Sequence, residues 1–211
     1  IHSYPFEQPG VENIHEIPVP ISALAVGEDF LFVALVNGDI LQADKSSGQT
    51  SILTSAAGIP STLALQGDKV YWPTFSEGDA GGILFVYDLE KGTTEELVSG
   101  FNFDNGLQVD DTDVYWADSM ERAIMAVDRF GGEPYVVAGQ EYGLTALTSD
   151  RFFIYYATGS NDYIKAVPKN GGSALALSAG VSDVTNMLVT DDQRLFFIGN
   201  FVIDNVFYID L

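Results

Sequence analysis

Cysteine is absent from this sequence of 211 residues. Its absence excludes disulfide bonds, thiolate catalysis and cysteine-ligated metal sites. Histidine is almost absent as well, because the two histidines, His2 and His15, both lie in the N-terminal segment. A catalytic triad with a histidine base therefore has no support in the sequence.

Basic residues and long apolar runs are also scarce. The chain has 9 Lys and Arg against 30 Asp and Glu, which gives a formal net charge of −21. This charge repels nucleic acid and anionic membranes, and it favours basic or cation-bridged partners. The alternative is that the acidic surface serves only solubility. No run approaches the roughly 18 apolar residues of a membrane span, so we expect no membrane insertion.

The chain begins at Ile1 rather than at a methionine, and it contains no signal segment. Such a beginning is typical of a chain whose signal was removed or whose end was trimmed. We therefore expect a secreted, cell-surface or periplasmic location.

A pair of bulky residues recurs with a period close to forty residues. The first members of the five pairs lie 39, 44, 40 and 41 residues apart, and an apolar marker downstream of each pair recurs at 44, 40, 40 and 42. The pairs are Phe32-Val33, Tyr71-Trp72, Tyr115-Trp116, Tyr155-Tyr156 and Phe196-Phe197, and the markers are Ile40, Leu84, Ile124, Ile164 and Val206. Two markers that hold one period indicate five structural repeats.

The third repeat shows most clearly that a unit contains four short strands. We predict strands over residues 107–109, 114–117, 123–128 and 135–138, separated by polar or glycine-containing turns. Gly131-Gly132 lies between the third and fourth strands, where glycine supplies the positive φ that tight hairpins need. The other repeats carry Ser47-Gly48, Lys91-Gly92 and Gly171-Gly172 at this place.

Several strands are apolar on both faces, for example Ile83-Leu84-Phe85-Val86 and Ile124-Met125-Ala126-Val127. A sheet of this kind must be packed between two neighbouring sheets. Four-stranded antiparallel sheets of about forty residues with two apolar faces are typical of the blades of a β-propeller. We therefore predict an all-β fold, a five-bladed β-propeller.

We expect a single domain over residues 1–211. The blades are predicted near residues 20–58, 59–100, 101–140, 141–180 and 181–211. The last repeat ends at Leu211 after its third strand, and residues 11–17 match the fourth strands of other repeats, with Ile14 equivalent to Ile52, Val136 and Ala176. We predict that residues 11–17 supply the fourth strand of the last blade and lock it to the first blade.

The run Val114-Tyr115-Trp116-Ala117-Asp118, with Ile124 and Gly131-Gly132 after it, resembles the YWTD repeat of low-density-lipoprotein-receptor propellers. It resembles still more closely the secreted bacterial YWTD-like propellers of unknown function. The resemblance touches all five repeats and is strong in the third, where Ala117 replaces the motif threonine. It implies a propeller with a binding role, a motif aspartate that bonds between blades, and no catalytic residue. The receptor family usually has six blades, whereas five are counted here.

Propellers generally bind ligands on the face formed by the loops from second to third strand and from each fourth strand to the next blade. Aromatic side chains on such a rim stack on sugar rings or hold a cationic group. The alternative is that these side chains pack between blades. The candidate binding residues at the rim and the central channel are Trp72, Trp116, Tyr156, Asp118, Glu121, Asp104, Asn105, Thr145, Asp183 and Asn186.

Acidic residues recur on the predicted rim, but no run has the D-x-D-x-D-G order of a calcium loop. We predict no cofactor and assign no metal ligand, while calcium stays open because gathered oxygen ligands accept it. Aspartates that recur in the turns between first and second strands, such as Asp110 and Asp150, are interpreted as turn-forming residues.

The sequence thus predicts a secreted, ligand-binding propeller whose acidic, aromatic rim takes a protein or a glycan. One alternative is a glycoside hydrolase or lyase that uses two rim carboxylates, which Asp104, Asp118, Glu121 or Asp183 can supply. Calcium dependence belongs to this alternative. The other alternative is a structural module without a small-molecule site. No catalytic residue is assigned.

Overall fold

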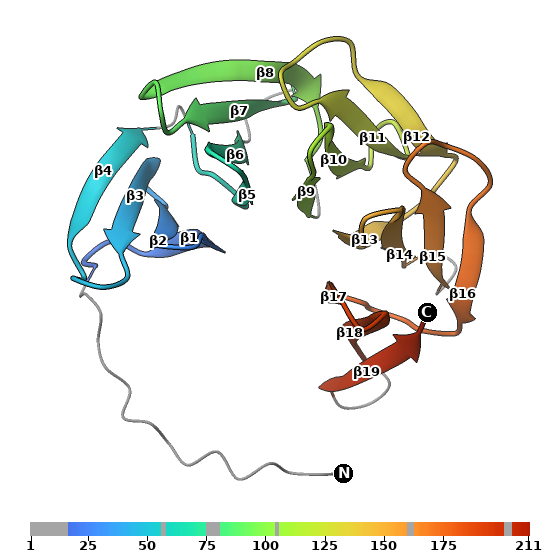
Figure 1. Ribbon diagram of the computed structural model, residues 1–211. Helices are drawn as coiled ribbons and strands as arrows, with labels where there is room; N and C mark the ends of the chain where they lie inside the picture. Colours follow the sequence, from blue (N-terminus) through green and yellow to red (C-terminus); the bar gives the residue numbers. More distant parts are fainter. Residues whose placement is uncertain (1–16, 56–57, 75–80, 104–105, 160–162, 201–203) are drawn as a thin grey trace, which may run out of the picture.

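The structure is a computed structural model that describes residues 17–55, 58–74, 81–103, 106–159, 163–200 and 204–211. These residues form 19 β-strands and no helix, so a membrane-spanning helix is not among their elements. The strands make five antiparallel sheets that follow one another along an open arc (Figure 1). The prediction of an all-β, five-bladed propeller is confirmed.

The five sheets, called blades 1 to 5, follow the order of the chain. Blade 1 contains β1 (Ile21–Val26), β2 (Phe30–Leu35), β3 (Asp39–Asp44) and β4 (Thr50–Ser55). Blade 2 contains β5 (Ala64–Gln66), β6 (Lys69–Thr74), β7 (Gly82–Asp88) and β8 (Thr93–Phe101). Blade 3 contains β9 (Leu107–Val109), β10 (Asp113–Asp118), β11 (Ala123–Asp128) and β12 (Tyr135–Gly139). Blade 4 contains β13 (Leu144–Ser149), β14 (Phe153–Thr158), β15 (Tyr163–Pro168) and β16 (Leu175–Ala179). Blade 5 contains β17 (Asn186–Thr190), β18 (Arg194–Asn200) and β19 (Asp204–Asp210).

The strands of each blade pair in sequence order, with the first strand nearest the centre of the arc and the last at its outside (Figure 1). The strands predicted for the third repeat agree with β9 to β12. Gly131 and Gly132 have φ values of 98° and 136°, the left-handed conformation expected of the turn before β12.

The second sequence marker lies at a β-bulge. In each four-stranded blade the register between third and fourth strands shifts directly after the marker residue, which is Ile40, Leu84, Ile124 or Ile164. All four side chains are fully buried. A bulge increases local twist, and a buried β-branched or leucine side chain at this point fixes the twisted strand against the core.

Hydrophobic clusters fill the space between consecutive blades. Because successive side chains of a strand point to opposite faces, the two members of the bulky pair in blades 2, 3 and 4 belong to different clusters. Trp116 packs in the cluster between blades 2 and 3, whereas Tyr115 packs between blades 3 and 4. Tyr71 and Trp72 divide in the same way between the clusters on either side of blade 2. The repeated pair therefore joins blades 2, 3 and 4 to both of their neighbours.

Blade 5 has three strands within the described residues, with β19 at its outer edge. The fourth strand was predicted for residues 11–17, of which 11–16 lie outside the described residues. Blades 1 and 5 lie at the two ends of the arc (Figure 1). Apolar side chains on these end blades are exposed, among them Leu24 and Val26 of β1 and Leu188, Val206 and Tyr208 of blade 5. The predicted lock between the two blades stays a prediction.

Candidate functional site

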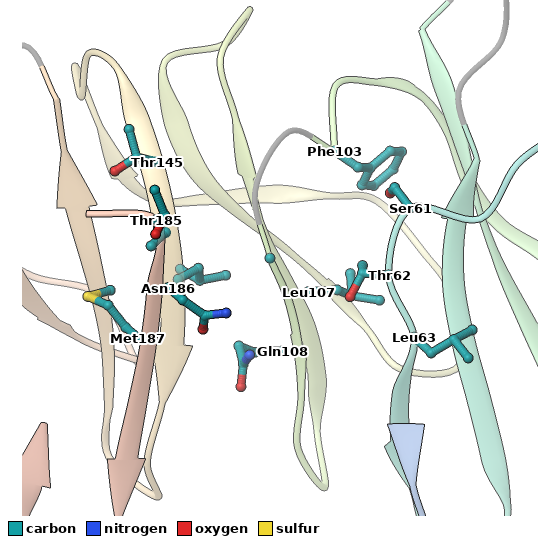
Figure 2. Close-up of a pocket in the computed structure, with 13 residues that line it drawn as sticks. Ser61, Thr62, Leu63, Phe103, Leu107, Gln108, Thr145, Thr185, Asn186 and Met187 are labelled. Carbon is teal, nitrogen blue, oxygen red and sulfur yellow. The ribbon is translucent and has the colours of Figure 1, made fainter. Parts of the chain in front are cut away.

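A cavity of about 380 Å³ opens at the mouth of the central channel. Blades 2 to 5 and the segments that lead into them contribute its walls (Figure 2). The lining residues are Ser61, Thr62, Leu63, Phe103, Gly106, Leu107, Gln108, Thr145, Ala146, Leu147, Thr185, Asn186 and Met187.

The repeat places these residues at equivalent points of each blade. Leu107, Leu147 and Met187 lie forty residues apart at the innermost strands β9, β13 and β17, and their side chains are buried. Gly106 has a φ of 86°, and a Cβ atom there would lie 3.0 Å from the Cβ of Leu147. Glycine thus lets the start of β9 approach β13 closely, which narrows the channel and brings the polar side chains of neighbouring blades into one cavity.

The cavity combines neutral polar groups with an apolar wall. Ser61, Thr62, Thr145 and Thr185 bring hydroxyl groups, and Gln108 and Asn186 bring amides (Figure 2). The Oγ1 atom of Thr145 is buried and has no hydrogen-bond partner among the described residues. A buried hydroxyl without a partner costs free energy.

Two of the sequence-predicted site residues, Thr145 and Asn186, line this cavity together. Asp183 lies in the segment before β17, is exposed, and has a φ of 53°. Glu121 is exposed on the loop between β10 and β11 and does not line the cavity. Asp104 and Asn105 lie outside the described residues. The structure therefore gathers part of the predicted set.

The aromatic candidates are not on the rim. Trp72, Trp116 and Tyr156 are each 0% exposed and belong to the clusters between blades. Trp116 contacts the rings of Phe101 and Phe103, at 5.5 and 5.3 Å between centroids. The prediction that these three rings contact a ligand is corrected: their faces are covered by neighbouring blades, as the packing alternative required.

Asp118 is also corrected from a rim ligand to a buried structural group. Its Oδ2 atom accepts a hydrogen bond from the backbone N–H of Asn102, and Oδ1 accepts two more from Met120 and Glu121, each at 2.9 Å. Asn102 follows the last strand of blade 2, so the carboxylate ties two blades together. This is the role that the YWTD resemblance implied for the motif aspartate, and it leaves the side chain without access to a substrate.

Sequence reasoning missed four of the six polar side chains that line the cavity, namely Ser61, Thr62, Gln108 and Thr185. The repeat carried the signal, because each lies within two residues of Leu63, Leu107 or Met187, which occupy equivalent places in their repeats. None of the four carries a charge or an aromatic ring that would mark it as a site residue in the sequence. They are ordinary hydrogen-bonding groups whose role comes only from their convergence on the channel.

The turn aspartates behave as predicted. The Oδ1 atom of Asp110 accepts the backbone N–H groups of Thr112 and Asp113, and that of Asp150 accepts those of Phe152 and Phe153. Within the described part of the chain, no three Asp, Glu or His side chains gather in an arrangement that could hold a metal ion. The expectation of no cofactor, with calcium left open, stays a prediction.

Comparison with known proteins reveals similarity of fold. No family model matches the chain, and no curated protein matches it by sequence. Among solved structures, the propeller of a nidogen/laminin complex has a TM-score of 0.71 at 17% identity, over 92% of this chain and 76% of that one.

Two other solved structures are similar. A regucalcin from Agrobacterium tumefaciens, described as a calcium-binding protein, has a TM-score of 0.67 at 17% identity, over 87% of this chain and 69% of that one. A luciferin-regenerating enzyme has a TM-score of 0.68 at 12% identity, over 87% and 71%. At such identities the likeness establishes the fold alone, and the fold occurs in a protein complex as well as in an enzyme.

Proposed function

We propose that this protein is a binding module that holds a partner protein at the mouth of its central channel. The channel cavity carries the proposal, because hydroxyl and amide groups from several blades surround one recess of about 380 Å³ beside an apolar wall. Ligand sites of proteins have this size and this mixture of groups. Hydroxyls and amides both donate and accept hydrogen bonds, so they pair with the amides and hydroxyls of an inserted loop.

Two observations favour a protein over a glycan. The aromatic rings on which sugar stacking depended are buried between blades. The net charge of −21 favours a partner with a basic surface, since opposite charge accelerates encounter. The similar propeller of the nidogen/laminin complex supports the proposal by showing this fold engaged with another protein. We propose a secreted, cell-surface or periplasmic location for the interaction.

Affinity capture from the source proteome, followed by calorimetric titration of the purified partner, tests the proposal. The double variant Thr145→Val and Asn186→Leu removes one hydroxyl and one amide from the cavity while keeping similar side-chain size. We expect it to weaken binding by at least about tenfold, because each buried hydrogen bond lost leaves a partner group unpaired. Ser51→Ala, on the outer strand of blade 1, is the matched control and should leave the affinity unchanged.

Equal affinity of the cavity variant and the wild-type protein would reject the channel mouth as the binding site. A glycan array run beside the capture separates the two ligand classes. Saturable glycan binding that the cavity variant abolishes, without a protein partner, would replace the proposal by a carbohydrate-binding function.

A further inference from the structure

One backbone hydrogen bond recurs in all five blades at the end opposite to the channel mouth. The residue directly after the third strand donates its N–H to the carbonyl that precedes the second strand. The residues at this place, which we call the hairpin-end position, are Lys45, Leu89, Arg129, Lys169 and Leu211. Because strands alternate in direction, this end of every blade lies away from the loops that form the channel mouth.

Between blades 3 and 4 the hairpin-end side chain makes an ion pair across the boundary. Lys169 Nζ lies 2.8 Å from Asp110 Oδ2 and 5.1 Å from the centre of the Tyr115 ring. The hydroxyl of Tyr115 donates to the same carboxylate oxygen at 3.1 Å. Only 12% of the Lys169 side chain is exposed, so its aliphatic stem is buried across the boundary. At this boundary the chain therefore supplies both the lysine and the groups that bind it.

Between blades 4 and 5 the same pair of groups, an aspartate carboxylate and a tyrosine hydroxyl, has no cation beside it among the described residues. We call this pair the frame. Asp150 and Tyr155 lie forty residues after Asp110 and Tyr115, and the hydroxyl of Tyr155 donates to Asp150 Oδ2 at 2.7 Å. Burial, then the hydrogen bond to Asp150 and its charge, raises the pKa of Tyr155, so the hydroxyl keeps its proton. The hairpin-end position of blade 5 is Leu211, and no described cation forms an ion pair with Asp150.

The frame is specific to these two boundaries. Five residues before Tyr71 of blade 2 stands Gln66, and five before Phe32 of blade 1 stands Gly27, so neither position carries a carboxylate. In blade 5 Asp191 stands five residues before Phe196, which has no hydroxyl group. At the boundary between blades 1 and 2, Leu89 packs against an apolar cluster. At that boundary an apolar hairpin-end residue therefore contacts apolar neighbours. Between blades 4 and 5, in contrast, the apolar Leu211 faces a carboxylate and a phenol.

An open groove lies at this boundary. Its volume is about 250 Å³, and its lining includes Asp150, Tyr155 and Leu211 together with apolar side chains. Phe152 and Leu175 at its edges are 62% and 66% exposed. A lysine needs an apolar surface for its stem and an oxygen acceptor for its ammonium group, and this groove offers both.

We propose that the groove between blades 4 and 5 binds a lysine side chain presented by a basic partner protein. The stem lies along Leu175 and Leu211, and the ammonium group reaches Asp150 as Lys169 reaches Asp110 at the neighbouring boundary. The chain's net charge of −21 attracts such a partner. The groove lies at the opposite end from the channel mouth, so this second surface stands independently of the proposed channel function.

NMR titration with Nα-acetyl-lysine methylamide, followed through the methyl groups of Leu175, Leu177 and Leu211, tests the proposal. We expect saturable shifts that the norleucine analogue, which has no ammonium group, does not produce. Asp150→Asn should weaken binding about tenfold, because it removes the charge but keeps an oxygen for the turn amides. Asp110→Asn is the matched control and should leave these shifts unchanged.

A second variant places a lysine of the chain itself in the groove. Leu211→Lys should abolish the ligand-induced shifts and raise Tm by about 2–4 °C, a range that corresponds to about 1 kcal/mol in a protein of this size. Leu211→Met, without charge, should not raise Tm. Absence of saturable shifts in the wild-type protein, equal binding of the norleucine analogue, or unchanged binding in Asp150→Asn would each overturn the proposal. So would a Leu211→Lys protein that still binds the ligand.

Discussion

Asp118 connects two blades through three backbone hydrogen bonds. Replacement by alanine would leave the N–H groups of Asn102, Met120 and Glu121 without this acceptor at a fully buried position. Unpaired buried donors cost about 1–3 kcal/mol each when water cannot reach them. We expect Asp118→Ala to lower the free energy of unfolding by about 3 kcal/mol, measured by urea denaturation.

Glu121→Ala is the control for this experiment. Its side chain is exposed on the same loop, so the change should stay within about 0.5 kcal/mol. An Asp118→Ala protein as stable as the wild type would show that the carboxylate does not hold the blades together. Asp118 would then return to the set of candidate ligand-binding residues.

Asp110 makes the free energy of unfolding depend on pH in a predictable way. Burial alone would raise the pKa of its carboxyl group, but hydrogen bonds from Lys169, from the amides of Asp113 and Thr112, and from the Thr112 hydroxyl hold this pKa well below its usual range. An unfolded aspartate has a pKa of about 3.9. The stabilisation is therefore fully present above about pH 4, and it is lost as the pH falls through the folded-state pKa.

Asp110→Asn should accordingly lower the free energy of unfolding by about 2 kcal/mol at pH 7, the usual contribution of a charge-assisted hydrogen bond. The difference from the wild type should shrink below about pH 4, measured by urea denaturation at several pH values. Asp192→Asn, in an exposed ion pair with Arg194, should change stability by less than about 1 kcal/mol. A difference that is constant between pH 7 and pH 3 would contradict the assignment.

At the scale of strands, β19 is the outer strand of blade 5 and pairs only with β18 among the described residues. The outer edge of a sheet is a template for pairing with a further strand. The sequence predicts residues 11–17 as its partner, since Ile14 matches Ile52, Val136 and Ala176 of the other fourth strands. We expect removal of residues 1–17 to speed amide hydrogen exchange throughout β19.

The exchange of β11, in the interior of blade 3, serves as the reference in the same experiment and should not change. If β19 exchanges equally fast in the intact and shortened proteins, residues 11–17 do not pair with it. The predicted lock between the first and last blades would then be wrong.

Strands were predictable because their signals are local and repeated. Tyr115-Trp116, Ile124 and Gly131-Gly132 each mark one feature of a blade: the bulky pair that joins two neighbours, the bulge, and the hairpin turn. The direction of each aromatic side chain was harder to predict, since a strand presents alternate residues to opposite faces and both faces are buried here. This is why Trp116 was expected on the rim and lies between blades.

At the scale of the whole molecule, the site depends on convergence that no single repeat reveals. Thr145 and Asn186 were predictable from the loops that lead to the channel, but Ser61 and Gln108 have no distinctive chemistry in sequence. Their role arises because innermost strands of several blades meet at one cavity (Figure 2). The groove at Leu211 depends on the same comparison between blades, because it is visible only beside the complete ion pair of Lys169.

The central claim is that a partner protein binds at the channel mouth, and hydrogen–deuterium exchange of the free and partner-bound protein tests it most directly. We predict slower exchange upon binding in residues 61–63, 106–108, 145–147 and 185–187, with the outer strands β4 and β12 unchanged. Protection confined to the outer strands, with the channel segments unaltered, would contradict the claim.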